Sequence, residues 1–150
     1  MVKKGLFIVF EGIDGSGKST QIKMLYDKLS LLNMNCHLTA EPSKRPIGRM
    51  IRDVFSENLH MDNLVVAGLF VADRLDHLLN QHDGMLKMLN NQYHVLCDRY
   101  YLSSMAYQSV FAPMDWIIQS NALSRNLLKP DITFYLDADP ELSLQRIHVQ

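Results

Sequence analysis

The sequence predicts an α/β fold in which a doubly wound parallel sheet carries helices on both of its faces. Four short apolar runs of β-prone residues recur along the chain, and segments with helical spacing of apolar residues lie between them. A glycine-rich turn also joins the first apolar run to the first helical segment, as in the strand–loop–helix unit of such sheets. We therefore expect ligands to bind at the carboxyl edge of the sheet.

The first half of the chain reads as a βαβ unit followed by two helices. Residues 6–10 form an uninterrupted apolar run, which is typical of a central parallel strand. A helix follows to about Leu32, and residues 36–39 form the second strand. Apolar positions over 47–55 indicate an amphipathic helix. Apolar residues on nearly every face of 64–79 indicate a helix buried in the domain.

The second half continues the alternation of helices and strands. In order, we expect a short helix ending at Asn91, a strand over 93–97, a helix over 114–128, a strand over 132–136 and a helix from Pro140. A length of 150 residues suits one domain. We therefore expect residues 1–150 to form a single domain.

The glycine-rich turn fits the phosphate-binding pattern G-x-x-x-x-G-K-[ST]. It reads Gly12-Ile13-Asp14-Gly15-Ser16-Gly17-Lys18-Ser19. Its glycines permit positive φ angles, so that successive backbone N–H groups can point at a polyphosphate. Lys18 would then contact the β- and γ-phosphates, and the Ser19 hydroxyl would bind Mg²⁺. The motif predicts binding of a nucleoside triphosphate such as ATP, whereas a tight turn without a ligand is disfavoured by the flanking strand and helix.

Four carboxylates, Glu11, Glu41, Asp98 and Asp137, each follow a predicted strand. The ends of parallel strands meet at one edge, so all four should lie there. A carboxylate in a phosphate site contacts Mg²⁺ through its hydration shell or orients a substrate hydroxyl, and we assign the Mg²⁺ role to Asp98. Arg99, next to Asp98, would supply positive charge between the donor and acceptor phosphates.

Four residues of the predicted helices could either have a structural or solvent-exposed position or contact a ligand. Arg74 lies in the apolar helix over 64–79 and needs a partner there, either a neighbouring Asp or a ligand anion or base edge. Phe70 lies one turn earlier on the same side, as a core residue or as a stacking platform. We expect Arg49 to face solvent, and the pattern leaves Arg52 open between solvent and a ligand.

Composition limits the classes of partner. The formal net charge of −1 lacks the basic excess of a nucleic-acid-binding face. Cys36 and Cys97 match no metal-ligand spacing and read as buried thiols of a reducing compartment. Only five apolar residues follow Met1-Val2-Lys3-Lys4, too few for a secretory signal or a membrane span. We expect a cytoplasmic protein without nucleic-acid or membrane partners.

Several motifs together resemble the thymidylate kinase family of nucleoside monophosphate kinases. They are Phe10-Glu11-Gly12-Ile13-Asp14-Gly15-Ser16-Gly17-Lys18-Ser19-Thr20, Thr39-Ala40-Glu41-Pro42, Gly48-Arg49-Met50-Ile51-Arg52, Phe70-Val71-Ala72-Asp73-Arg74, residues 98–108 and residues 129–137. The resemblance implies a sheet of the P-loop kinase type. It also implies transfer of the γ-phosphoryl group of ATP to dTMP, with Mg²⁺, giving dTDP for dTTP synthesis. A homodimer is the oligomeric state that it implies.

The resemblance also assigns roles to particular residues. It implies that the donor site comprises Gly12, Ile13, Asp14, Gly15, Ser16, Gly17, Lys18, Ser19 and Thr20. Lys18, Arg99 and Asp14 are its implied catalytic groups, and Ser19 and Asp98 its implied metal contacts.

On the acceptor side, Phe70 resembles the residue that stacks on thymine and Arg74 the residue that hydrogen-bonds the base edge. The other acceptor-side residues implied are Ser104 and Gln108 at the base, Tyr107 against the sugar, Arg52 and Arg99 near the phosphate, Asp14 and Glu41 near the sugar and phosphate groups, and Ser103.

The chain departs from the family pattern in two places. Ala40 stands where many bacterial members have an arginine before Glu-Pro, and the phosphate loop has no internal arginine. In members of that kind the arginine lies in a later lid, which would begin just after Arg146-Ile147. Relative to the family we expect the domain to be incomplete at its C-terminus, without the lid, the last strand and the adenine loop. The alternatives are a kinase of another nucleoside monophosphate or of a deoxynucleoside, and a nucleotide-binding module without turnover.

Overall fold

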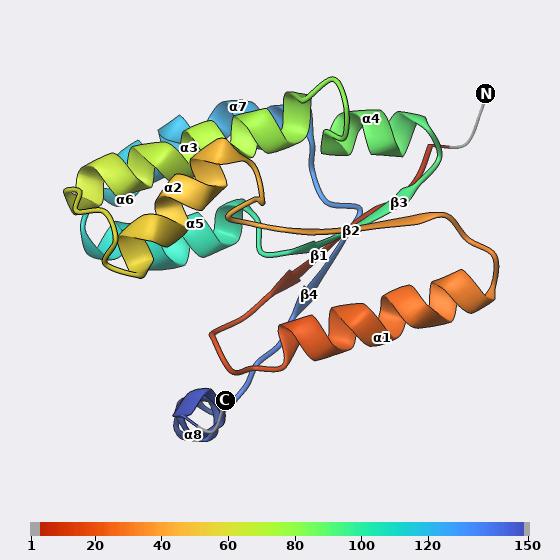
Figure 1. Ribbon diagram of the computed structural model, residues 1–150, viewed down its shortest axis with the longest axis horizontal. Coiled ribbons are helices and arrows are strands. Elements are labelled where there is room, and N and C mark those ends of the chain that lie inside the picture. Colours follow the sequence, from red (N-terminus) through yellow and green to blue (C-terminus); the bar gives the residue numbers. More distant parts are fainter. Residues whose placement is uncertain (1–3, 149–150) are drawn as a thin grey trace.

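In the computed structural model, which describes residues 4–148, four parallel strands lie between helices (Figure 1). The elements are β1 (Phe7–Glu11), α1 (Lys18–Leu31), β2 (Cys36–Ala40), α2 (Pro46–Phe55), α3 (Asn63–Leu79), α4 (Met85–Asn90), β3 (His94–Asp98), α5 (Tyr101–Tyr107), the 3₁₀ turn η1 (Gln108–Val110), α6 (Met114–Ser120), α7 (Ala122–Leu127), β4 (Ile132–Tyr135) and α8 (Pro140–His148). The strand order is β2-β3-β1-β4. The predicted α/β fold is confirmed.

The register of the sheet brings the predicted carboxylates to one edge. Asp98, the last residue of β3, pairs with Phe10 of β1 and with Ala40 of β2. Glu11 pairs with Tyr135 at the end of β4. Because all these pairings are parallel, the carboxyl ends of the strands and the loops that follow them line the same side of the domain.

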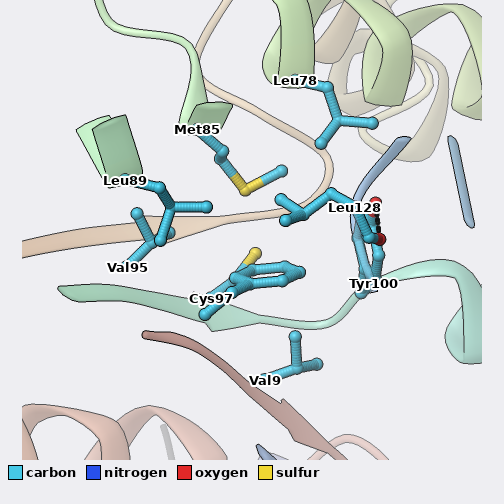
Figure 2. Close-up of a cluster of buried hydrophobic side chains, with 9 residues drawn as sticks. Val9, Leu78, Met85, Leu89, Val95, Cys97, Tyr100 and Leu128 are labelled. Carbon is cyan, nitrogen blue, oxygen red and sulfur yellow. Dashed lines mark hydrogen bonds between the residues drawn. The ribbon is translucent and has the colours of Figure 1, made fainter. Parts of the chain in front are cut away.

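Side chains of the central strand β1 alternate between two apolar layers. Ile8 and Phe10 pack with Ile22 of α1 on one face of the sheet. Phe7 and Val9 belong to the opposite layer, together with side chains of α3, α4 and β3. Figure 2 shows Val9 in this layer. Since successive residues of a strand point to opposite faces, an uninterrupted apolar run fits a strand that is covered on both sides.

The predicted helix over 114–128 is wrong in one respect, because the chain forms two helices there. α6 ends at Ser120 and α7 begins at Ala122, and the residue between them is Asn121. The Asn121 side chain is 1% exposed, and its Nδ2 donates to the backbone oxygen of Ile117 at 2.8 Å. The backbone N–H of Asn121 donates to the same oxygen at 3.2 Å, so the Ile117 carbonyl accepts two hydrogen bonds where α6 ends. Apolar spacing carries no trace of this interruption.

The helix predicted over 64–79 is present as α3, and its predicted burial holds from Val66 to Leu78, where no residue is exposed. Leu64 and Val65 are both 51% exposed, and Leu79 is also exposed. Apolar periodicity does not distinguish a side chain that faces the core from one that faces solvent. Exposure is therefore confined to the two ends of this helix.

The two cysteines have different surroundings. Cys97 is buried in β3, where burial raises the pKa of its thiol, whereas Cys36 of β2 is only partly buried. Both are free thiols; the predicted burial is confirmed for Cys97 and is wrong for Cys36, which is only partly buried. In residues 4–148, no helix is long and apolar enough to cross a bilayer.

Candidate active site

The loop between β1 and α1 has the backbone conformation that a phosphate-binding loop requires. Gly12, Gly15 and Gly17 have φ angles of 148°, 75° and 92°, a region that side chains disfavour. Lys18 begins α1, and its Nζ donates to the backbone oxygen of Ile13 at 2.8 Å. Burial, and secondarily the charge of Arg99, lowers the pKa of the Lys18 ammonium group.

A hydroxyl and a carboxylate meet beside this loop. Ser19 Oγ donates to Asp98 Oδ2 at 2.9 Å. The other oxygen, Asp98 Oδ1, is buried and has no hydrogen-bond partner among residues 4–148. Such a pair suits Mg²⁺, which takes few protein ligands and completes its shell with water and phosphate oxygens. Residues 4–148 contain no group of three or more His, Cys, Asp or Glu side chains that could hold a metal ion by themselves.

Arg99 lies between the phosphate-binding loop and α5. Its Nη1 donates to Gly12 O and to Ser103 Oγ, both at 3.0 Å. Its Nη2 contacts Asp14 Oδ1 at 2.6 Å and Tyr107 Oη at 3.3 Å. The Arg99 backbone has a φ of 71°, which is strained for a residue with a side chain. The fold therefore holds this guanidinium in place at some conformational cost.

Glu11 stabilises the turn in which Arg99 lies. Its side chain is buried, with Oε1 accepting from the Tyr100 N–H at 3.0 Å and Oε2 accepting from Ser103 Oγ at 2.6 Å. Burial raises the pKa of this carboxyl, although the hydrogen bonds act in the opposite direction. Although Glu11 follows the apolar run of β1 as predicted, it contacts protein groups, and its place in this site is that of a loop anchor.

Two adjoining cavities meet at Arg99. The larger, of about 1330 Å³, is lined by the phosphate-binding loop together with residues such as Arg52 and Asp98. The smaller, of about 420 Å³, is lined by Phe70, Arg74 and neighbouring residues of α5 and η1. Residues lining both cavities are Asp14, Glu41, Pro42, Phe55 and Arg99. The arrangement can hold a polyphosphate in one cavity and a second molecule in the other.

Arg74 is only 1% exposed and is held by acceptors from several parts of the chain. Nε donates to Glu41 Oε2 at 2.7 Å and Nη2 donates to Ser104 Oγ at 2.9 Å. The third acceptor is Asn121 Oδ1, which contacts Nη1. The guanidinium also lies 5.5 Å from the ring centroid of Tyr100. The alternative of a neighbouring Asp as the partner of Arg74 is wrong.

Asp73, which directly precedes Arg74 in the sequence, binds the loop after β2 instead. Its Oδ2 accepts from the Ser43 N–H at 2.7 Å, and its Oδ1 accepts from Ser43 Oγ at 2.6 Å. Arg52 binds the same loop through its Nη1, which donates to Pro42 O at 3.0 Å and to Ser43 O at 2.7 Å. Arg49 is exposed, as predicted.

The walls of the smaller cavity combine aromatic and polar groups. Phe70 is partly buried, with its ring centroid 6.1 Å from that of Phe55. Gln108 is buried, and its Oε1 has no hydrogen-bond partner among the described residues. Tyr107, at the end of α5, is 41% exposed. An aromatic face and a buried, unpaired amide oxygen in one cavity suit a planar polar ligand.

Helix α8 adds a residue that the sequence did not predict for the site. Arg146 Nη1 donates to Gly15 O at 3.2 Å and lines the larger cavity. A Cβ on Gly15 would lie 2.3 Å from the backbone oxygen of Ser143. Only glycine therefore permits the loop to approach the backbone of α8 this closely. In Figure 1, α8 lies beside the loop that leads from β1 into α1. Arg146 is distant in sequence from the glycine-rich motif, so no local signal identified it.

Comparison with known proteins decides the family. A sequence model described as thymidylate kinase matches residues 10–150. A probable thymidylate kinase of Methanocaldococcus jannaschii is 44% identical over 142 residues, which cover 95% of this chain and 69% of that protein. The thymidylate kinase of Caldicellulosiruptor saccharolyticus is 40% identical over 147 residues, 96% of this chain and 70% of that protein. The chain belongs to the thymidylate kinase family.

A solved structure from the thymidylate kinase family supports the fold as well. The crystal structure of thymidylate kinase from Ehrlichia chaffeensis superposes with a TM-score of 0.78 at 33% identity. The match covers 97% of this chain and 79% of that one. The resemblance and the P-loop kinase architecture inferred from the motifs are therefore confirmed.

The structure gathers the residues that the thymidylate kinase motifs single out. Those that line one or both cavities are Asp14, Gly15, Ser16, Gly17, Lys18, Ser19, Thr20, Glu41, Arg52, Phe70, Arg74, Asp98, Arg99, Ser103, Ser104, Tyr107 and Gln108. Gly12 and Ile13 contribute backbone oxygens to Arg99 and Lys18 instead. The roles of all these residues toward ligands stay predictions. Sequence reasoning missed Asn121 because a single buried asparagine has no distinguishing local pattern.

Proposed function

We propose that this chain is a thymidylate kinase that transfers the γ-phosphoryl group of ATP to dTMP, giving ADP and dTDP. The observation that carries the proposal is the position of Arg99, which lines both the cavity at the phosphate-binding loop and the cavity of Phe70 and Arg74. A cation at that junction can contact a donor and an acceptor phosphate together.

On the donor side, backbone N–H groups of the glycine-rich loop bind the phosphates of ATP, and Lys18 neutralises them. Ser19 and Asp98, whose side chains meet beside the loop, would hold Mg²⁺. When bound, Mg²⁺ neutralises charge on the β- and γ-phosphates. Arg146 lines the donor cavity and donates to Gly15 O of the loop, so its charge lies beside the site proposed for the phosphates of ATP.

On the acceptor side, Phe70 stacks on thymine while Arg74, Ser104 and Gln108 bind the polar edges of the base. The remaining acceptor groups are Tyr107 at the sugar, Arg52 and Arg99 at the phosphate, Asp14 and Glu41 beside the sugar and phosphate, and Ser103, which holds Arg99. Ala40 offers no charge in a place where many family members have an arginine.

The reaction needs no covalent intermediate. A phosphate oxygen of dTMP attacks the γ-phosphorus of ATP, the bond to the β–γ bridging oxygen breaks, and ADP leaves with that electron pair. Because charge spreads over the transferring group, the contribution of the protein is positioning and electrostatic stabilisation by Lys18 and Arg99. Asp14, in contact with Arg99, helps to hold that guanidinium in place.

A coupled assay of ADP formation tests the proposal. dTMP, dUMP, UMP, CMP and thymidine are supplied separately with ATP and Mg²⁺, and parallel reactions contain EDTA. We expect turnover with dTMP and its loss in EDTA. Preference for UMP or CMP would reject the thymidine nucleotide as substrate, and preference for thymidine would indicate a deoxynucleoside kinase. Tight binding of Mg·ATP without transfer to any acceptor would indicate a nucleotide-binding module.

The proposed oligomer is a homodimer, and α3 offers a surface for it. Leu64 and Val65 expose apolar side chains at the start of this helix. Sedimentation equilibrium should give twice the mass of the chain, and Val65→Glu should reduce it to one mass without unfolding. A monomeric parent protein would reject the dimer.

We also propose a cytoplasmic location, because both cysteines are free thiols. Recovery of the protein in a membrane or secreted fraction would reject this location.

A further inference from the structure

Asn121 occupies the junction between α6 and α7 and is almost fully buried. Its side-chain amide accepts one hydrogen bond and donates another. Oδ1 accepts from Arg74 Nη1, and Nδ2 donates to Ile117 O at 2.8 Å. A guanidinium can only donate and a carbonyl can only accept, so the orientation of the amide is determined by its two partners.

The contact with Asn121 completes the set of acceptors around Arg74. Nε is held by Glu41, Nη2 by Ser104 and Nη1 by Asn121. These acceptors come from the end of β2, from α5 and from the α6–α7 junction, so that the guanidinium plane is fixed from three directions. Of the five N–H groups of an arginine, one on each of Nη1 and Nη2 is left for other partners.

Asn121 itself does not line the smaller cavity, whereas Arg74 does. We propose that Asn121 is a positioning residue for the nucleotide base: by holding Arg74 it sets how the remaining N–H groups of the guanidinium meet the base edge. This inference rests on the proposed function, in which that base is thymine. Without the Asn121 oxygen, Nη1 has one more unpaired donor and the guanidinium loses one of its three fixed contacts.

Two substitutions of similar size separate this role from a structural one. Asn121→Leu and Asn121→Asp both remove the side-chain N–H that binds Ile117 O, so both weaken the helix junction, although the backbone N–H of residue 121 still donates to that oxygen. Only Asn121→Asp keeps an oxygen acceptor for Arg74. A purely structural role would make dTMP affinity follow the stability of each variant, whereas a positioning role lowers dTMP affinity only in the variant that lacks the oxygen acceptor.

The measurement is calorimetric binding of dTMP and, separately, of Mg·ATP to the full chain. We expect Asn121→Leu to weaken dTMP binding roughly 10- to 100-fold, since a hydrogen bond to a charged group is lost. Asn121→Asp should stay within about threefold of the parent, and Mg·ATP affinity should be unchanged in both variants. In turnover, the KM for dTMP should rise in Asn121→Leu with little change in kcat.

A double-mutant cycle adds a second test. In an Arg74→Lys background, where the guanidinium is absent, Asn121→Leu should have little further effect on dTMP affinity. Equal dTMP affinities of Asn121→Leu and Asn121→Asp, or additive effects in the cycle, would overturn the inference. If neither Asn121→Leu nor the smaller Asn121→Ala folds, the contact is a requirement of the fold and the inference is likewise overturned.

The parent protein distinguishes failure of this inference from failure of the proposed function. If it binds UMP or CMP in place of dTMP, the thymidylate proposal fails, and the comparison of variants is made with the nucleotide that binds. If it binds none of these nucleotides, both proposals fail together. Binding of dTMP by the parent with no difference between the variants rejects only the role of Asn121.

Discussion

Arg99 is the residue on which the proposed chemistry depends most. It is held by Gly12, Asp14, Ser103 and Tyr107, so its substitution removes a preorganised charge. We expect Arg99→Ala to lower kcat roughly a hundredfold or more, on the order of 3 kcal/mol, with the fold retained. Arg99→Lys should restore little, because an ammonium cannot reproduce a planar fork that touches two phosphate groups.

Steady-state kinetics with dTMP and ATP measure this effect, and circular dichroism checks the fold. Arg49→Ala is the matched control, since Arg49 is an exposed arginine of α2; its kcat should equal that of the parent. An Arg99→Ala enzyme with kcat within about threefold of the parent would reduce Arg99 to a structural partner of Asp14.

Lys18 gives the site a dependence on pH. Burial lowers the pKa of its ammonium group from the ordinary value of 10.5, so its charge is lost at a lower pH than that of an exposed lysine. Only the protonated form attracts phosphate. The affinity for ATP should therefore fall as pH rises through this lowered pKa. Phosphate groups are fully ionised above about pH 7.5, so they do not contribute to the change.

Fluorescence titration with an ATP analogue between neutral and alkaline pH measures the effect. Lys18→Arg is the control because a guanidinium stays charged throughout this range. The arginine variant is expected to bind with an affinity that is independent of pH, whatever its absolute value. The same alkaline decline in both proteins would assign it to another group.

At the scale of elements, α3 anchors the segment that follows β2. Asp73 binds Ser43, Asp76 binds Arg45 at 2.6 Å, and His77 Nδ1 lies 3.3 Å from Glu41 Oε1. These contacts repeat along the helix and hold a loop whose residues line both cavities. The position of the acceptor cavity therefore depends on how α3 packs against the end of β2.

The contacts that α3 makes with this segment should contribute unequally to the free energy of unfolding, because the side chains of α3 that make them differ in burial. Asp73→Ala leaves the buried Ser43 N–H without its acceptor, and we expect it to lower the free energy of unfolding by about 2–3 kcal/mol. Asp76→Ala, whose side chain is 32% exposed, should cost less than about 1 kcal/mol. Urea denaturation measures both. Equal losses would contradict the argument from burial.

At the scale of the whole molecule, ligands should stabilise the domain because they bind only its folded form. At 100 times its Kd, dTMP should add about 2.7 kcal/mol, which corresponds to a rise in Tm of roughly 5–10 °C for a domain of this size. Mg·ATP should raise the free energy of unfolding by a separate amount, and EDTA should abolish this rise if Ser19 and Asp98 hold Mg²⁺. Thermal scanning measures both. A Tm that responds to UMP but not to dTMP would contradict the assigned base.

Much of the fold and the donor half of the site was determined by the sequence itself. The run over 6–10, the glycine-rich turn and Lys18 specify strand, loop and helix through local properties: side-chain alternation, permitted φ angles and helical spacing. The carboxylates after the strands were predictable for the same reason, because parallel pairing places every strand end at one edge.

The tertiary structure alone decided which long-range partners meet. Arg74 binds Glu41, Ser104 and Asn121 rather than an adjacent Asp, and Arg146 reaches Gly15 from 131 positions along the chain. It also decided that α3 exposes Leu64 and that the helix over 114–128 is interrupted. Periodicity and motifs describe near neighbours in sequence. A buried hydrogen bond, by contrast, depends on where the packed layers bring distant polar groups together.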